Sequence, residues 1–168
     1  SLEQTAEKYA DRVAVSDVNQ ELTWKELVKK AQVIGVELSE KVQPGNPVPV
    51  LLEKSSETLA VMLGIVYAGC FYVPVNPMNP AERLRKIMEK LEPEVIISDE
   101  RGKEQLAAVG IGLEEKVIGP ETLLPTTGTD LSEEQRSKLE QIQGQWKETD
   151  ALYGIFTSGS TGTPKAIV

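Results

Sequence analysis

The stretch "FYVPVNPMNPAERLRKIMEKLEPEVIIS", residues 71–98, holds the pattern that decides the fold. Its two ends are runs of β-branched and aromatic residues, which favour strands over 71–75 and 94–98. Between them, Pro80 suits the first position of a helix, and apolar side chains recur at helical spacing until Pro93 stops the pattern. That apolar stripe consists of Leu84, Ile87, Met88 and Leu91. A strand, a helix and a second apolar strand predict a β-α-β unit with parallel strands.

The same alternation of strand and helix patterns runs through most of the chain. Further strands are predicted over 12–17, 48–53 and 116–119. Further helices are predicted to begin at Thr23 with a capping box to Glu26, at Ser55 or Ser56, near Lys103, and at Ser132. We therefore expect an α/β fold in which parallel β-α-β sheet layers carry helices on both faces.

Composition excludes several classes of function. The 168 residues carry a formal net charge of −8, which argues against a nucleic-acid partner. The chain has no histidine, so a Ser-His-Asp triad cannot form within it. The longest apolar run, 59–70, is too short to span a bilayer, and no signal peptide is recognised. The single cysteine, Cys70, cannot form an internal disulfide, and we expect a cytoplasmic protein.

Residues 157–165, "TSGSTGTPK", form a glycine-punctuated loop between two apolar runs. Gly159 and Gly162 permit left-handed backbone turns that can direct successive amides into one concavity, and Lys165 adds a positive charge. No acidic side chain occurs from Tyr153 onwards, so the local field favours an anion. The loop is not a Walker motif, because no GK[ST] follows the glycines. On composition alone, an ordinary surface turn is favoured over a phosphate site, since Gly, Ser, Thr and Pro are common turn residues.

The order of the residues resembles a known family. "FTSGSTGTPK" (156–165) is similar to the phosphate-loop motif of the adenylate-forming (AMP-binding) superfamily. That superfamily includes acyl-CoA synthetases, the adenylation domains of nonribosomal peptide synthetases and D-alanine–carrier protein ligases. "LTWKEL" (22–27), "YAGCFYVPVNPMNPAERLRKIM" (67–88), Asp150 and Tyr153 resemble further motifs of the superfamily, in the same order. The resemblance therefore extends over essentially the whole chain.

This resemblance implies a ligase that activates a carboxylic acid with ATP, releases pyrophosphate and transfers the acyl group to a thiol. It implies ATP and Mg²⁺ as cofactors, an amino acid as substrate, and a carrier-protein phosphopantetheine or CoA as acceptor. It assigns no catalytic residue and no metal ligand within the chain. The residues that it assigns to the ATP phosphates are Thr157, Ser158, Gly159, Ser160, Thr161, Gly162, Thr163 and Lys165.

Two positions depart from the family pattern: Ala166 replaces the usual glycine after the lysine, and Asn76 replaces the usual aspartate. Residues 1–168 are expected to be a single partial domain, the N-terminal subdomain of an AMP-binding enzyme, and to be inactive alone. Two alternatives remain open at this point. One is a fragment of an acyl-CoA synthetase, and the other is a non-catalytic module for anion binding or assembly.

Overall fold

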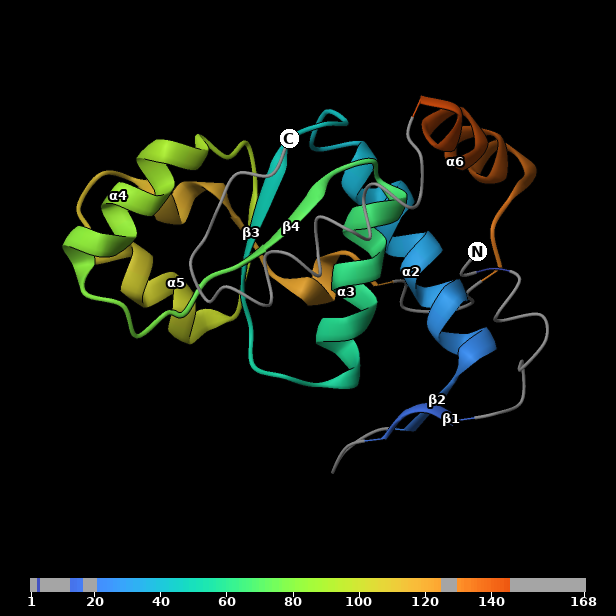
Figure 1. Ribbon diagram of the computed structural model, residues 1–168, viewed down its shortest axis with the longest axis horizontal. Helices are drawn as coiled ribbons and strands as arrows, with labels where there is room; N and C mark the ends of the chain where they lie inside the picture. The colour runs from blue at the N-terminus through green and yellow to red at the C-terminus, as the bar shows by residue number, and fades with distance from the viewer. Residues whose placement is uncertain (1–2, 4–12, 17–20, 125–129, 146–168) are drawn as a thin grey trace.

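The computed structural model describes residue 3 and residues 13–16, 21–124 and 130–145. Its main feature is a four-stranded parallel sheet with the strand order β4-β3-β5-β6. The strands are β3 (Pro47–Leu51), β4 (Phe71–Pro74), β5 (Ile96–Ser98) and β6 (Val117–Ile118). The chain therefore passes from β3 to β4 at one edge and returns past β3 to reach β5 (Figure 1).

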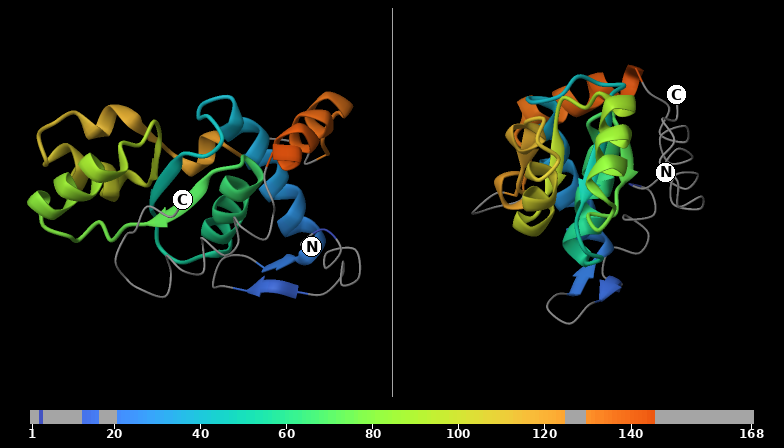
Figure 2. Two further views of the ribbon diagram at one scale, coloured as in Figure 1. Left: turned by 45° about the horizontal axis from the view of Figure 1, so that its top comes forward. Right: turned by 90° about the vertical axis from the view of Figure 1, so that its left-hand side faces the viewer.

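Helices cover both faces of this sheet, as the sequence predicts (Figures 1 and 2). Helices α2 (Trp24–Ser39) and α3 (Ser56–Tyr67) pack on one face. Helices α4 (Ala81–Leu91) and α5 (Glu100–Ala107) pack on the other. Helix α6 (Glu133–Gln145) lies against α2 and contributes Leu139 to the first of these two cores.

Alternation along the strands divides the apolar side chains between the two cores. Val48 and Val50 of β3 belong to the core beneath α2 and α3, whereas Leu51 belongs to the core beneath α4 and α5. In β5, Ile97 faces the first core and Ile96 the second. Both faces of the sheet are thus buried, which explains why its strands read as continuous apolar runs.

Helices α2 and α3 cross in close contact, and this crossing depends on two glycines. A Cβ added to Gly64 would overlap Ile34 Cγ2 and lie 3.1 Å from the carbonyl oxygen of Ala31. A Cβ added to Gly35 would lie 2.7 Å from Tyr67 Cβ. The absence of side chains at these two positions therefore allows the helix backbones to approach each other.

The capping box predicted at Thr23 is present, and the helix predicted to begin at Ser132 has a capping box as well. Thr23 Oγ1 accepts a hydrogen bond from the Glu26 amide at 3.2 Å, and the Glu26 carboxylate accepts one from the Thr23 amide at 3.5 Å. At the start of α6, the Gln135 amide donates to Ser132 Oγ at 3.1 Å, and the Ser132 amide donates to Gln135 Oε1 at 2.9 Å. These local signals fix two helix starts independently of tertiary packing.

Residues 21–23 form a strand that the sequence reading did not identify. This strand, β2 (Glu21–Thr23), pairs antiparallel with β1 (Val13–Ser16), which lies within the strand predicted over 12–17. The pair forms a separate two-stranded sheet next to the start of α2 (Figure 1). A three-residue strand is too short for side-chain alternation to reveal it.

Two helix starts differ from the predictions. Pro80 is the N-cap of α4 and not its first helical residue, because its carbonyl oxygen accepts the first helical hydrogen bond, from the Leu84 amide at 3.0 Å. Helix α5 begins at Glu100, three residues before Lys103, because Asp99 caps it. Pro93 does lie just beyond α4, whose C-cap is Glu92 in the left-handed conformation.

Cys70 is fully buried, and desolvation raises the pKa of its thiol to about 12. The thiol is therefore part of the core and is not activated as a nucleophile. No helix in the described part of the chain is long and apolar enough to cross a membrane.

Candidate functional site

A pocket of about 690 Å³ opens at the carboxyl ends of β3 and β5. The chain leaves β3 toward α3 on one face of the sheet and leaves β5 toward α5 on the opposite face. Because the two segments diverge, a crevice forms between them, and open α/β sheets bind ligands at such a switch point. We call this pocket the switch crevice. Its lining comes from the segments 52–58, 98–103 and 117–121.

Two helices begin at the switch crevice, and the side chain of each N-cap residue accepts a hydrogen bond from an amide in the first turn. Ser55 Oγ accepts a hydrogen bond from the Thr58 amide at 3.1 Å at the start of α3. Asp99 Oδ1 accepts one from the Gly102 amide at 2.8 Å at the start of α5. These caps satisfy amides that would otherwise be available to an anionic ligand.

The charges that line the switch crevice are mostly negative. Its two ammonium groups belong to Lys54 and Lys103. Its carboxylates belong to Glu53, Glu57, Asp99, Glu100 and Glu121. This excess of negative charge opposes a triphosphate, so the crevice alone does not replace the predicted phosphate loop. Among the described residues, no group of three or more metal-ligating side chains could hold a metal ion.

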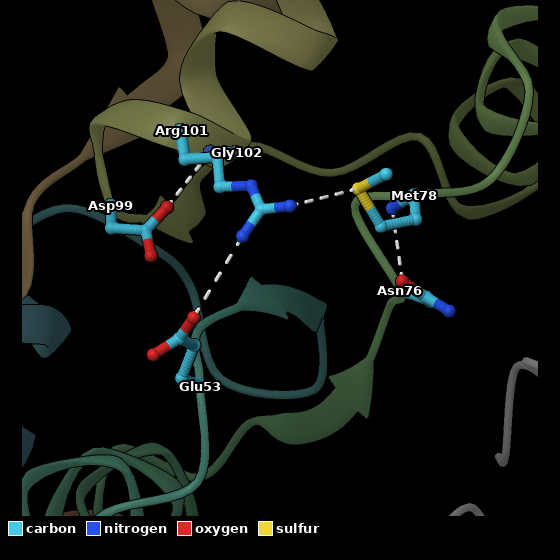
Figure 3. A network of polar contacts seen from close by, with 6 residues as sticks. All are labelled: Glu53, Asn76, Met78, Asp99, Arg101 and Gly102. Carbon is cyan, nitrogen blue, oxygen red and sulfur yellow. Dashed lines mark hydrogen bonds and ion pairs between the residues drawn. The ribbon is translucent and has the colours of Figure 1, made fainter.

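Arg101 connects the loops that follow two neighbouring strands at this edge (Figure 3). From the first turn of α5, its Nη1 lies 3.9 Å from Glu53 Oε1, just after β3. Its Nη2 donates to Met78 Sδ, in the loop after β4, at 3.4 Å. Both members of the ion pair are exposed, so the pair contributes less than about 1 kcal/mol to stability.

Asn76 shapes the loop after β4 through its side-chain oxygen (Figure 3). Its Oδ1 accepts a hydrogen bond from the Met78 amide at 2.9 Å, and its carbonyl oxygen accepts one from the Asn79 amide at 3.2 Å. An aspartate oxygen could accept the same hydrogen bond from Met78. The departure from the family pattern at this position therefore preserves the loop geometry.

The predicted phosphate-binding residues 157–165 lie outside the described residues, as do Asp150, Tyr153 and Ala166. Their assignment stays a prediction. Two residues with polar contacts at this edge of the sheet, Asp99 and Arg101, were not predicted from the sequence. For Asp99 a signal existed, because an aspartate followed by Glu100 directly after an apolar strand is a typical helix start.

An open parallel sheet with helices on both faces and a crevice at its switch point defines a doubly wound α/β protein. The model of the family described as "AMP-binding enzyme" matches residues 2–168. The chain belongs to this family.

The curated relatives include two bacterial peptide synthases. Bacitracin synthase 1 of Bacillus licheniformis is 34% identical over 171 residues, covering 99% of this chain and 3% of the relative. Tyrocidine synthase 1 of Brevibacillus parabrevis is 32% identical over 164 residues, covering 97% of this chain and 14% of the relative. The chain thus spans a small part of the length of these relatives.

Solved structures of a nonribosomal peptide synthetase, FmoA3 (S1046A), share the fold. One matches with a TM-score of 0.65 and 29% identity, covering 76% of this chain and 14% of the other. Another, the AMPPNP-bound form, matches with a TM-score of 0.64 and 28% identity, covering 77% and 14%. The similarity therefore extends to a relative whose structure was determined with an ATP analogue.

Proposed function

We propose that this chain is the N-terminal portion of a longer ATP-dependent ligase that activates an amino acid as an acyl-adenylate. The observation that carries the proposal is the "FTSGSTGTPK" loop in the context of the whole chain. Bacitracin synthase 1 and tyrocidine synthase 1 match this chain over 99% and 97% of the length of the chain. The described sheet supports it, because its carboxyl edge is where this class of fold binds ligands.

In the proposed reaction, a carboxylate oxygen of the acid attacks the α-phosphorus of ATP. A new O–P bond forms, the bond to the β-phosphate breaks, and pyrophosphate leaves with the electron pair. Both reactants are anions, so the protein must neutralise charge and hold them in line. The hydroxyls and amides of residues 157–165 would bind the departing phosphates, and Lys165 would supply a positive charge.

Mg²⁺ would add charge neutralisation at the same phosphates. We assign it no protein ligand among the described residues, because they contain no group of three or more carboxylate or cysteine side chains that could hold a metal ion. The metal would instead accompany the nucleotide, as Mg²⁺ commonly does when substrate phosphates supply several of its ligands.

The acceptor is proposed to be the phosphopantetheine thiol of a carrier protein. The sulfur would attack the acyl carbon, form a C–S bond, displace AMP and release the thiol proton. The similarity to peptide synthases favours a carrier protein over free CoA.

The test is amino-acid-dependent exchange between ATP and pyrophosphate, measured on the full-length protein that contains this chain. We expect exchange with at least one amino acid from a complete panel, and none above background with residues 1–168 alone. Exchange by the isolated chain would contradict its proposed inactivity. Exchange with fatty acids only, followed by loading of CoA, would favour an acyl-CoA synthetase.

A further inference from the structure

Met78 is the most exposed large apolar side chain in the described part of the chain. It is 62% exposed, in the loop that joins β4 to α4 at the carboxyl edge of the sheet. The other two methionines are more deeply placed: Met88 is 2% exposed in the core beneath α4, and Met62 is partly buried in α3. Core packing therefore does not account for a thioether at position 78.

The sulfur of Met78 faces a cation (Figure 3). Arg101 Nη2 donates to Met78 Sδ at 3.4 Å, and Nη1 of the same guanidinium lies 3.9 Å from Glu53 Oε1. The backbone of Met78 is held as well, because its amide donates to Asn76 Oδ1 at 2.9 Å. A thioether sulfur is a weak acceptor, so Arg101 is a strong donor placed beside an atom that makes little use of it.

Oxidation of the sulfur strengthens this contact. A lone pair of Met78 Sδ attacks one oxygen of a hydroperoxide, and the O–O bond breaks. The proton on the transferred oxygen passes to the leaving oxygen, which departs as water or an alcohol. Sulfur has then lost two electrons to the peroxide and gained a bond to oxygen, giving methionine sulfoxide. The sulfoxide oxygen accepts a stronger, charge-assisted hydrogen bond from a guanidinium than the thioether does.

We propose that Met78 is a site of reversible oxidation by hydroperoxides, and that its sulfoxide holds Arg101 at the expense of the contact between Arg101 and Glu53. That ion pair competes weakly, because both of its members are exposed and its atoms lie 3.9 Å apart. Oxidation then ties the loop after β4 to the first turn of α5 and releases the segment after β3. Methionine sulfoxide reductases restore the thioether, so the modification acts as a switch.

The first experiment measures which methionine is oxidised. The full-length protein that contains this chain is treated with hydrogen peroxide at neutral pH, and sulfoxide at each methionine is followed by peptide mass spectrometry. We expect Met78 to be oxidised about tenfold or more faster than buried Met88, with Met62 between them. A mixture of the two methionine sulfoxide reductases, one for each epimer, should restore Met78. Oxidation of Met78 no faster than that of Met88 would overturn the assignment of the site.

The second experiment tests the capture of Arg101, through hydrogen exchange of the peptide that spans the loop after β4. Peroxide should slow exchange of this peptide about threefold or more in the wild type. The slowing should disappear in Arg101→Gln, which keeps a good helix former in α5. It should persist in the matched control Arg136→Gln, which replaces an exposed arginine of α6.

The variant Met78→Leu separates oxidation of Met78 from oxidation elsewhere in the protein, and its loop should not respond to peroxide. A response in Met78→Leu would overturn the role of Met78. No response in the wild type, or an equal response in Arg101→Gln, would overturn the capture of Arg101 by the sulfoxide. Both experiments are independent of catalysis, so a failure of the proposed ligase function would leave this inference standing.

Discussion

The crossing of α2 and α3 provides the sharpest test of the fold, through the substitution Gly64→Ala. The new Cβ would overlap Ile34 Cγ2 and lie 2.7 Å from Ile34 Cβ and 3.1 Å from the Ala31 carbonyl oxygen. Neither Ile34 Cβ nor a backbone oxygen can move away by rotating a side chain, so the two helices must separate. Overpacking of this kind costs about 3 kcal/mol at the upper end, and the better helix propensity of alanine returns about 1 kcal/mol.

We therefore expect Gly64→Ala to lower the free energy of unfolding by about 2 kcal/mol, measured by urea denaturation with circular dichroism. The matched control is Gly144→Ala in α6, where a new Cβ would meet nothing within 4 Å. This control should be neutral or stabilising by up to about 1 kcal/mol. If both variants were equally stable, the close approach of α2 and α3 would be refuted.

Three further predictions concern individual side chains. Asn76→Asp should leave the free energy of unfolding within about 0.5 kcal/mol of wild type, whereas Asn76→Ala should lower it by about 1 kcal/mol because the Met78 amide loses its acceptor. Equal free energies of unfolding for the two variants would contradict the role of the Asn76 side chain. Burial raises the pKa of the Cys70 thiol to about 12, so Cys70 should resist thiol reagents at pH 8 until urea unfolds the protein. The contribution of the buried thiol to the free energy of unfolding should be lost as pH rises from about 9 to 12. Rapid labelling of the folded protein would disprove the burial of Cys70. Glu40 accepts a hydrogen bond from Lys138 at 2.8 Å, and this contact lowers the Glu40 pKa. The pair therefore stabilises the folded protein at pH values above the ordinary glutamate pKa, and this stabilisation is lost as pH falls through the lowered pKa of the folded state. Lys138→Met should raise the Glu40 pKa toward 4.5, measured by NMR titration, and an unchanged pKa would argue against the contact.

The parts of the fold that local signals specify were predictable from the sequence. The capping boxes at Thr23 and Ser132 mark their helices correctly, because each involves only residues three apart. Ser55 caps α3, and Gly69, at φ 77°, lies just past its end, as a C-terminal glycine should. These features depend on backbone amides that neighbouring residues satisfy.

The strand order β4-β3-β5-β6 could not be derived in this way. Hydrophobic runs identify buried strands but do not say which strands are neighbours, because every strand buries both faces. The switch crevice, which depends on that order, was therefore also beyond prediction. Arg101 was missed for the same reason, since its contacts with Glu53 and Met78 join residues far apart in the sequence.

Pro49 shows that a proline in a central strand disrupts pairing only with the neighbouring strand that its backbone faces. Proline cannot donate a hydrogen bond, so a ladder starting only at Val50 would be expected. The structure pairs β3 with β4 from Pro47 onward but with β5 only from Val50. The Val50 carbonyl oxygen accepts a hydrogen bond from the Val75 amide on the β4 side, and the Leu51 carbonyl oxygen accepts one from the Asp99 amide on the β5 side. Because the backbone groups of successive residues in a strand point to opposite neighbours, those of Pro49 point toward β5. The missing donor therefore affects one ladder and not the other.

The most direct test of the central claim is ATP binding to the full-length protein, measured by calorimetry for wild type, Lys165→Ala and the control Lys25→Ala. Loss of a charge-assisted contact to phosphate should weaken ATP binding about tenfold or more in Lys165→Ala, and the control should bind like wild type. Equal affinity for ATP in all three proteins would contradict the assignment of residues 157–165 to the ATP phosphates.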